Sequence, residues 1–142
     1  MARSEPLPLD AYPSHTSTDI RYADLDRQGH VNNAVFATFC EIGRVAFLYD
    51  PERPLAPDGT SFVIARLAID FRAELFWPGT VEIGTGVLSV GRSSMTLAQG
   101  LFNEGRCVAT VEGVIVMQDE ATRRSKPLPP DTIKALQGLM LR

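Results

Sequence analysis

The sequence has little basic charge and lacks a long apolar run, and both shortages exclude classes of protein. It holds 14 basic and 17 acidic side chains, which give a formal net charge of −3. A nucleic-acid-binding protein needs a basic face to neutralise phosphates, so we expect no nucleic-acid partner. No segment approaches the roughly 18 apolar residues of a membrane span, and no basic stretch followed by an apolar one marks a secretory signal. We therefore expect no membrane partner and a cytoplasmic location.

Cysteine is scarce as well, because Cys40 and Cys107 are the only two and lie far apart in the sequence. Each stands in an apolar context, which favours two buried thiols in a reducing compartment over a disulfide. Their spacing matches no metal-binding pattern. The sequence thus predicts neither a metal site nor a disulfide framework.

The chain has 142 residues, of which 44% are apolar, and this is enough for one domain with a core of its own. Three prolines, Pro6, Pro8 and Pro13, stand among small and polar residues near its start. We interpret residues 1–14 as a flexible N-terminal arm and residues 15–142 as a single domain.

Hydrophobic periodicity predicts one strand, a long helix, four further strands and a short final helix. The long helix carries apolar side chains over more than half of its circumference, so it should be mostly buried. Gly43 inside this helix would be tolerated where a strand approaches closely. The apolar residues that alternate in the second strand are Val63, Ala65, Leu67, Ile69 and Phe71. The predicted ranges are 16–22, 34–48, 62–76, 80–90, 95–103, 107–117 and 131–141.

Tight turns separate the four later strands, which predicts a continuous four-strand antiparallel meander. A sheet of five strands and one apolar helix pack most economically if the sheet curls around the helix. The fold class is therefore α+β. So long a sheet has an edge that needs covering, and a dimer is expected for this reason.

The segment 24–33 crowds two carboxylates, a glycine, a histidine and two asparagines directly before the long helix. A helix N-terminus offers backbone N–H groups without internal partners and a partial positive charge. Asn33 or Asn32 can cap the helix, and Gly29 lets the loop approach it closely. This inventory of polar groups at a helix start indicates a functional site.

The order of elements and the residues before the helix resemble the hotdog-fold acyl-CoA thioesterases, specifically the 4-hydroxybenzoyl-CoA thioesterase-like family. The family motif runs from an aromatic residue through two aspartates to Gly-His-Val-Asn-Asn, followed by Glu-x-x-Arg on the helix. Glu41 and Arg44 supply the last pair, and Phe36 replaces a tyrosine of the motif. The resemblance covers about residues 17–129 and implies a hotdog fold, with a five-stranded antiparallel sheet wrapped around one long central helix. The matching segment here is Tyr22-Ala23-Asp24-Leu25-Asp26-Arg27-Gln28-Gly29-His30-Val31-Asn32-Asn33.

By this resemblance Asp26 is the catalytic carboxylate, and Asn33 presents a backbone N–H to the thioester carbonyl. Asp26 could act as a nucleophile that forms a mixed anhydride or as a general base on water. A plain alternative is that Asp26 only caps the loop. His30, the third candidate catalytic residue, could donate a hydrogen bond to the ligand or orient the loop.

Gly29, Asn32 and Phe36 are the other residues expected at the substrate. Coenzyme A is polyanionic, so an acidic protein needs a local basic cluster to bind it. The candidates are Arg92, Arg123 and Arg124, with simple solvation of these side chains as the alternative. Coenzyme A enters as part of the substrate, and no other cofactor is predicted.

Two further acidic residues have a structural interpretation. Asp24 can pair with Arg21 or Arg27 at the end of the first strand. The spacing of Glu41 and Arg44 on the helix favours an ion pair over direct chemistry.

The leading hypothesis is a thioesterase that hydrolyses an acyl-CoA or acyl-carrier-protein thioester to free acid and thiol. The resemblance implies a homodimer or homotetramer in which two sheets join edge to edge and the active sites lie between subunits. The alternatives are a non-catalytic acyl-CoA-binding regulatory protein and, third, a hotdog dehydratase using Asp26 and His30 as an acid–base pair.

Overall fold

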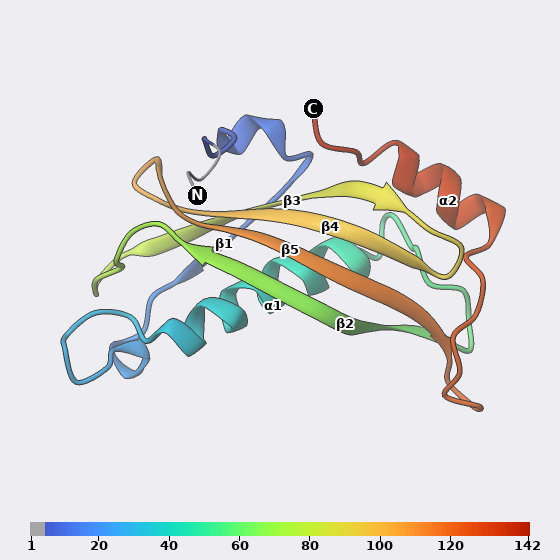
Figure 1. Ribbon diagram of the computed structural model, residues 1–142, viewed down its shortest axis with the longest axis horizontal. Helices are drawn as coiled ribbons and strands as arrows, with labels where there is room; N and C mark the ends of the chain where they lie inside the picture. The colour runs from blue at the N-terminus through green and yellow to red at the C-terminus, as the bar shows by residue number, and fades with distance from the viewer. Residues whose placement is uncertain (1–4) are drawn as a thin grey trace.

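The computed structural model describes residues 5–142, which form a five-stranded antiparallel sheet with one long helix, α1, against one face (Figure 1). This is the predicted α+β arrangement. Residues 1–4 of the predicted arm lie outside the described residues. The elements are the 3-10 turns η1 (Leu9–Ala11) and η2 (Tyr22–Asp24), the helices α1 (Asn33–Leu48) and α2 (Pro130–Gln137), and the strands β1 (Ser14–Asp19), β2 (Thr60–Phe71), β3 (Thr80–Val90), β4 (Ser94–Asn103) and β5 (Arg106–Asp119).

The strands lie in the order β1-β3-β4-β5-β2, so the predicted four-strand meander is wrong. Only β3, β4 and β5 are consecutive neighbours, while β2 pairs with β5 at the edge. Residues 72–79, the crossing segment, carry the chain from one side of the sheet to the other past the start of α1 (Figure 1). The Arg72 N–H donates to Val108 O at 2.8 Å, and Leu75 O accepts from the Val31 N–H at 2.8 Å. These bonds replace the tight turn that the sequence suggested.

A β-bulge at Ala65 divides β2 into two halves. The pairing with β5 jumps from Ile64 opposite Ile115 to Arg66 opposite Val114. After the bulge, Leu67 and Ile69 pack on the core as the alternation predicts. Before it the predicted alternation is reversed, because Phe62 packs inward and Val63 is 38% exposed. One extra residue therefore lets both halves of β2 cover the core.

One face of α1 is buried, which is less of the helix than predicted, because Val45 and Ala46 are exposed. The helix packs tightly on β3 at Gly43. The side chain of Ile83, which is fully buried, occupies the space that a Cβ on Gly43 would need. Beside this contact Gln99 Nε2 donates to Cys40 O at 3.0 Å and to Thr85 Oγ1 at 3.1 Å. The helix thus rests directly on the Ile83 side chain, and the buried side chains of Gln99 and Thr85 beside it are hydrogen-bonded.

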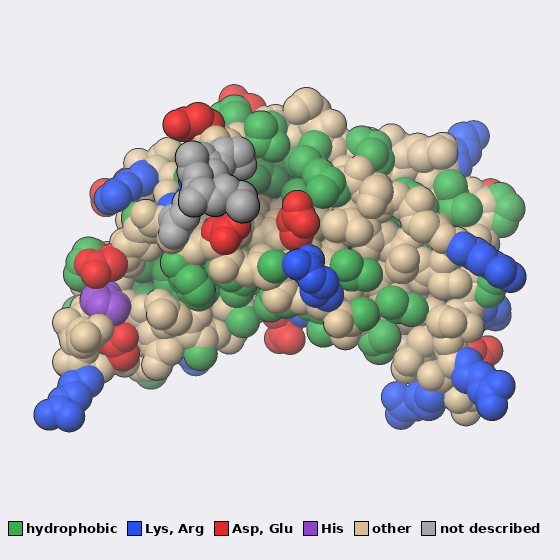
Figure 2. Space-filling model, in the orientation of Figure 1, with side chains coloured by type: hydrophobic (Ala, Val, Ile, Leu, Met, Phe, Trp, Pro, Cys, Tyr) green, Lys and Arg blue, Asp and Glu red, His purple; other side chains and the backbone are tan. Residues whose placement is uncertain are grey.

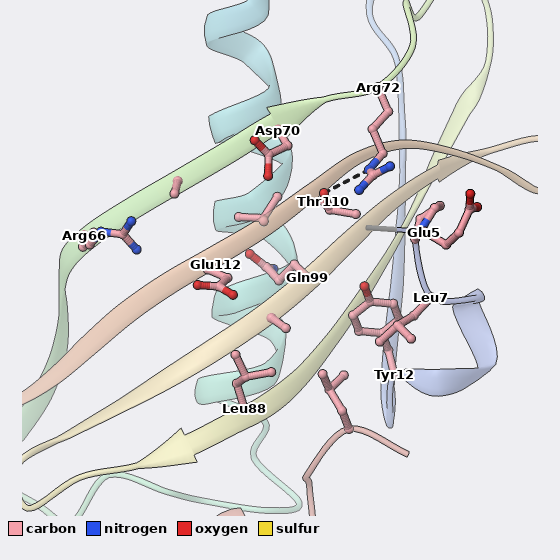
Figure 3. A pocket seen from close by; sticks show the side chains of 15 residues that line it. Glu5, Leu7, Tyr12, Arg66, Asp70, Arg72, Leu88, Gln99, Thr110 and Glu112 are labelled. Atoms are coloured by element: carbon pink, nitrogen blue, oxygen red, sulfur yellow. Dashed lines mark hydrogen bonds between the residues drawn. The ribbon is translucent and has the colours of Figure 1, made fainter. Parts of the chain in front are cut away.

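The other face of the sheet is partly covered by residues that precede β1. Tyr12 is 3% exposed and lies over Gly84 and Gly100, which face each other in β3 and β4. A Cβ on Gly84 would stand 2.7 Å from the Tyr12 ring. Burial raises the pKa of Tyr12 to about 12. This part of the predicted arm is packed on the sheet, beside an open hollow of about 740 Å³ that Figure 3 shows.

The two ends of the domain differ in detail from the predicted ranges. β1 ends at Asp19 because residues 22–24 form a 3-10 turn. α2 ends at Gln137, and the next residues run beside β3, where Val87 exchanges backbone hydrogen bonds with Leu139 O and the Leu141 N–H at 2.9 and 3.1 Å. Within residues 5–142, neither helix is long and apolar enough to cross a membrane.

Replacing Gly43 by alanine should destabilise the protein by about 1–3 kcal/mol, because the added methyl group overpacks the contact with Ile83. Alanine is the better helix former by about 1 kcal/mol, so a loss despite this gain identifies the contact as the cause. Urea unfolding of Gly43→Ala measures the loss. In an Ile83→Ala background the same change should be neutral or stabilising, and an equal loss in both backgrounds would contradict the assignment.

Candidate active site

The loop before α1 is held by the carboxylate of Asp24, which is 1% exposed. It accepts hydrogen bonds from the Arg21 backbone N–H at 2.8 Å and from Arg21 Nη2 at 2.7 Å. Burial acts to raise the pKa of Asp24, but the hydrogen bonds from Arg21 together outweigh it and the pKa is lowered. The Asp24 carbonyl also accepts the Asn32 N–H at 2.9 Å. The predicted pairing with Arg21 is confirmed, and it fixes the base of the loop.

Asp26 opens a tight turn that closes at His30. Asp26 Oδ1 accepts the Gln28 N–H at 2.8 Å, and the Asp26 N–H donates to His30 O at 2.9 Å. Gly29 has a φ of 88°, a left-handed conformation that glycine adopts without a steric penalty. Within the described part of the chain, Asp26 Oδ2 receives no hydrogen bond and faces the His30 ring.

The His30 ring lies between two carboxylates. Its Nδ1 is 3.5 Å from Asp26 Oδ2, and its Nε2 is 3.8 Å from Glu74 Oε1. The ring of Phe76 meets it edge to face, with the ring centres 6.4 Å apart. The side chains of His30 and Asp26 are 20% and 25% exposed, so both remain within reach of a ligand.

The start of α1 combines a cap with an open donor. Asn32 is the N-cap, and its Oδ1 accepts the Ala34 N–H at 2.9 Å. Among the described residues nothing accepts a hydrogen bond from the Asn33 N–H. A helix N-terminus with an unpaired N–H attracts an anion or a polarised carbonyl oxygen.

A pocket of about 440 Å³ lies at this helix start. Phe36 forms part of its apolar wall; it is 2% exposed and meets Phe71 with ring centres 5.1 Å apart. The predicted packing role of Phe36 is consistent with this contact, while Asp26, Gly29 and Asn32 lie on the adjoining loop and do not line the pocket. The lining residues are Gln28, His30, Val31, Asn33, Phe36, Phe71, Arg72, Ala73 and Glu74.

Glu74 and Arg72 were not predicted as site residues. Both belong to the part of the chain that was expected to be the end of a strand before a tight turn. The sequence carries no local signal of this, because Pro78 and Gly79 predict a turn after residue 76, whereas β2 already ends at Phe71. Glu74 and Arg72 line the pocket because of the strand order, which local sequence patterns do not encode.

The predicted basic cluster lies at the end of the sheet opposite the pocket. Val108 is bonded to the crossing segment near the pocket, whereas Arg123 follows the far end of β5. At about 3.3 Å a residue, the strand from Val108 to Asp119 separates them by roughly 35 Å. Basic side chains gather at that end in Figure 2, and Arg92, Arg123 and Arg124 are exposed. Within one chain, these arginines therefore do not meet the pocket.

Other reactive groups lie outside the pocket. Cys40 and Cys107 are both free thiols, the first fully buried and the second half-buried. Burial raises the pKa of Cys40 to about 12, which suits a structural role. Residues 5–142 contain no group of three His, Cys, Asp or Glu side chains placed to hold a metal ion. Glu41 stands 3.9 Å from Arg44, the ion pair that their spacing predicts.

A sequence model of the thioesterase-like superfamily matches residues 20–136, which contain the whole pocket. The chain belongs to the thioesterase-like superfamily. A thioesterase from Thermus thermophilus, whose crystal structure holds coenzyme A and zinc, is 30% identical to it. That alignment covers 92% of this chain and 96% of the other, with a TM-score of 0.80. No curated protein matches the sequence.

This thioesterase-like protein also shares its fold with less similar solved structures. The DHNA-CoA thioesterase of Staphylococcus aureus is 24% identical, with 88% of this chain and 89% of that chain covered and a TM-score of 0.76. Likeness at that identity shows the fold alone. The predicted family and the hotdog fold are both confirmed.

The lowered pKa of Asp24 predicts an acid-sensitive loop. A carboxyl group with a lower pKa in the folded than in the unfolded state stabilises the fold above its unfolded pKa, and this contribution is lost as pH falls through the folded pKa. Asp24→Asn should therefore cost more stability at pH 6 than at pH 3, as measured by urea unfolding. Arg21→Met should remove the same pH-dependent part, and an equal cost of Asp24→Asn at both pH values would contradict this origin.

Proposed function

We propose that this protein hydrolyses an acyl-CoA or acyl-carrier-protein thioester to a free acid and a thiol. The observation that carries the proposal is the Asn33 N–H, which has no acceptor among the described residues and belongs to a residue that lines the pocket together with His30. Asp26 stands beside His30 on the adjoining loop. An oxyanion donor at a developing negative charge typically lowers a barrier by about 2.7–4 kcal/mol. Superfamily membership supports the reaction class.

In the proposed reaction, the thioester carbonyl oxygen approaches the Asn33 N–H and the chemistry falls to Asp26. Gln28 holds Oδ1, which leaves Oδ2 free for one of two roles. Oδ2 can attack the carbonyl carbon and expel the thiolate, which gives a mixed anhydride that water hydrolyses to the free acid. Alternatively, it can take a proton from the water that attacks the carbonyl carbon and displaces the thiolate, which leaves as the thiol. His30 stands next to Oδ2 and can orient it. The acyl group would pack on Phe36 and Phe71. Coenzyme A is part of the substrate, and the reaction as proposed assigns no metal or other cofactor.

The exposed edge of β2 supports the proposal of a homodimer. Val63, Ile64 and Phe71 are 38%, 42% and 38% exposed along it, and an unpaired edge of this kind favours pairing with another strand. Antiparallel pairing of two β2 strands would bring the far end of the partner's sheet to the pocket. The exposed arginines at that end, which include Arg123 and Arg124, would then bind the phosphates of coenzyme A. We also propose that the protein is located in the cytoplasm.

One observation favours the binding-only alternative. Asp26 does not line the pocket, so a protein that binds acyl-CoA without cleaving it is the second candidate function. Tight coenzyme A binding without release of thiol from any acyl-CoA would support it. Hydration of an enoyl-CoA, which is the reverse of the dehydratase reaction, without release of thiol would indicate a dehydratase.

Replacing Asp26 by asparagine should lower kcat/KM by about 100-fold or more in an assay that follows free thiol from a panel of acyl-CoAs. The reason is that the amide can neither attack the carbonyl nor take a proton. Asp50→Asn is the matched control, since Asp50 Oδ1 accepts the Glu52 N–H at 3.0 Å in a turn of the same kind away from the pocket. Turnover that survives Asp26→Asn would remove Asp26 from the mechanism.

A charge on the edge of β2 should separate the proposed dimer. Ile64→Lys places an ammonium group in the edge-to-edge contact and should shift the sedimenting mass toward that of one chain. Met140→Lys is the control, because Met140 is 38% exposed but lies beside β3 on the opposite side of the sheet. A wild-type protein that sediments as a monomer, or an Ile64→Lys variant that keeps the wild-type mass, would contradict edge pairing at β2.

A further inference from the structure

Glu74 is the carboxylate that lines the pocket, although the sequence motif points to Asp26. We propose that Glu74 is a positioning residue of the site, whose carboxylate faces Nε2 of His30 and competes with Asp26 for the ring proton. The assignment rests on the proposed thioesterase function and adds a residue from outside the loop before α1. It follows from the placement of Glu74, the orientation of His30 and the chemistry of imidazole.

The placement of Glu74 is fixed from both sides. The Ala73 N–H donates to Val108 O at 3.2 Å, and Leu75 O accepts the Val31 N–H at 2.8 Å. The side chain of Leu75 is 1% exposed and anchors the crossing segment in the core. Glu74 and Phe76 flank Leu75, and both meet His30. The segment that carries Glu74 is therefore held against the loop that carries His30.

The two nitrogens of His30 face two different carboxylates. Nδ1 is 3.5 Å from Asp26 Oδ2 and Nε2 is 3.8 Å from Glu74 Oε1, with Phe76 on the edge of the ring. Arg72 is the other charged residue that lines this pocket. A neutral imidazole carries one N–H, so only one of the two carboxylates can receive it. The partner of one ring nitrogen thus sets the state of the other.

The Glu74 carboxylate stabilises the tautomer with the N–H on Nε2, whereas Asp26, at the shorter distance, stabilises the tautomer with the N–H on Nδ1. In the molecules whose ring proton is on Nε2, Asp26 Oδ2 receives no hydrogen bond from the ring, which keeps it basic or nucleophilic. A glutamine at position 74 can instead donate its own N–H to Nε2. The ring proton would move to Nδ1, where it would bind Asp26 Oδ2 and weaken it. Glu74 would in this way act on the reaction without touching the substrate.

Glu74→Gln tests this directly, because it keeps the size of the side chain and Glu74 is 64% exposed, so the fold should be unaffected. Long-range ¹H–¹⁵N spectra of the histidine rings, recorded over a range of pH, distinguish the two neutral tautomers from each other and from the protonated ring. The chain has only two histidines, and His15→Gln assigns the spectrum. We expect a larger share of the Nε2–H form of His30 in the wild type than in Glu74→Gln, in which the share of the Nδ1–H form should rise.

The kinetic readout uses the same variants. Glu74→Gln should lower kcat by on the order of tenfold with little change in KM, because ground-state binding is preserved while Asp26 is weakened. Glu74→Asp should recover part of the loss. The matched control is Glu41→Gln, since Glu41 is 65% exposed and faces Arg44 at 3.9 Å, outside the pocket lining. It should leave both the His30 spectrum and kcat unchanged.

The two measurements separate the inference from the proposed function. An unchanged His30 spectrum in Glu74→Gln would overturn the role of Glu74 even if the enzyme cleaves thioesters. A changed spectrum together with a fall in kcat would support it. If the wild type cleaves no thioester while the spectrum still changes, the proposed function fails and the contact between Glu74 and His30 stands.

Discussion

The contact between α1 and β3 at Gly43 is the constraint on which the other features of the fold depend. A helix without a side chain at this point can rest directly on the buried side chain of Ile83. Gln99 Nε2, from β4, also donates a hydrogen bond to the Cys40 carbonyl of the helix. The direction of the helix is therefore fixed by packing and by a polar contact together. Since a helix is nearly rigid, fixing its middle also fixes where its N-terminus points.

That N-terminus becomes a site because two separate segments converge on it. The loop before α1 brings Asp26 and His30, and it is tied down by the buried Asp24. The crossing segment brings Glu74 and is tied to the same loop through Leu75 O. Neither segment is a regular strand or helix, yet each is anchored by a residue that is almost fully buried. Preorganised groups of this kind need no rearrangement when charge develops on a substrate.

The sequence alone was sufficient for the parts of the fold that depend on local chemistry. Short patterns predicted the turn at Gly29 and nearly the full ranges of α1 and β3. They narrowed the cap to Asn32 or Asn33 and the partner of Asp24 to Arg21 or Arg27, and the structure selects Asn32 and Arg21. The motif before α1 also identified the family. The position of β2 beside β5 was predicted wrongly, because pairing between distant strands leaves no mark in local periodicity. Glu74 was missed for the same reason.

The placement of the arginines shows a second limit of sequence reasoning. Arg92, Arg123 and Arg124 are basic and exposed, which is what a phosphate site requires, yet their end of the sheet is remote from the pocket. Charge and exposure can be judged from composition and turns. Which end of a sheet a turn occupies depends on the direction of every strand before it.

The bulge at Ala65 restricts what can join the free edge of the sheet. A bulged strand bends, and its outward row of N–H and C=O groups loses its regular spacing at that point. A straight strand from an unrelated protein can match one half of such an edge but not both. A second copy of β2, bent in the same way and turned about a twofold axis, offers a matching irregularity. In the proposed dimer, the same inserted residue that lets β2 cover the core would thus favour pairing with a second copy over pairing with an unrelated strand.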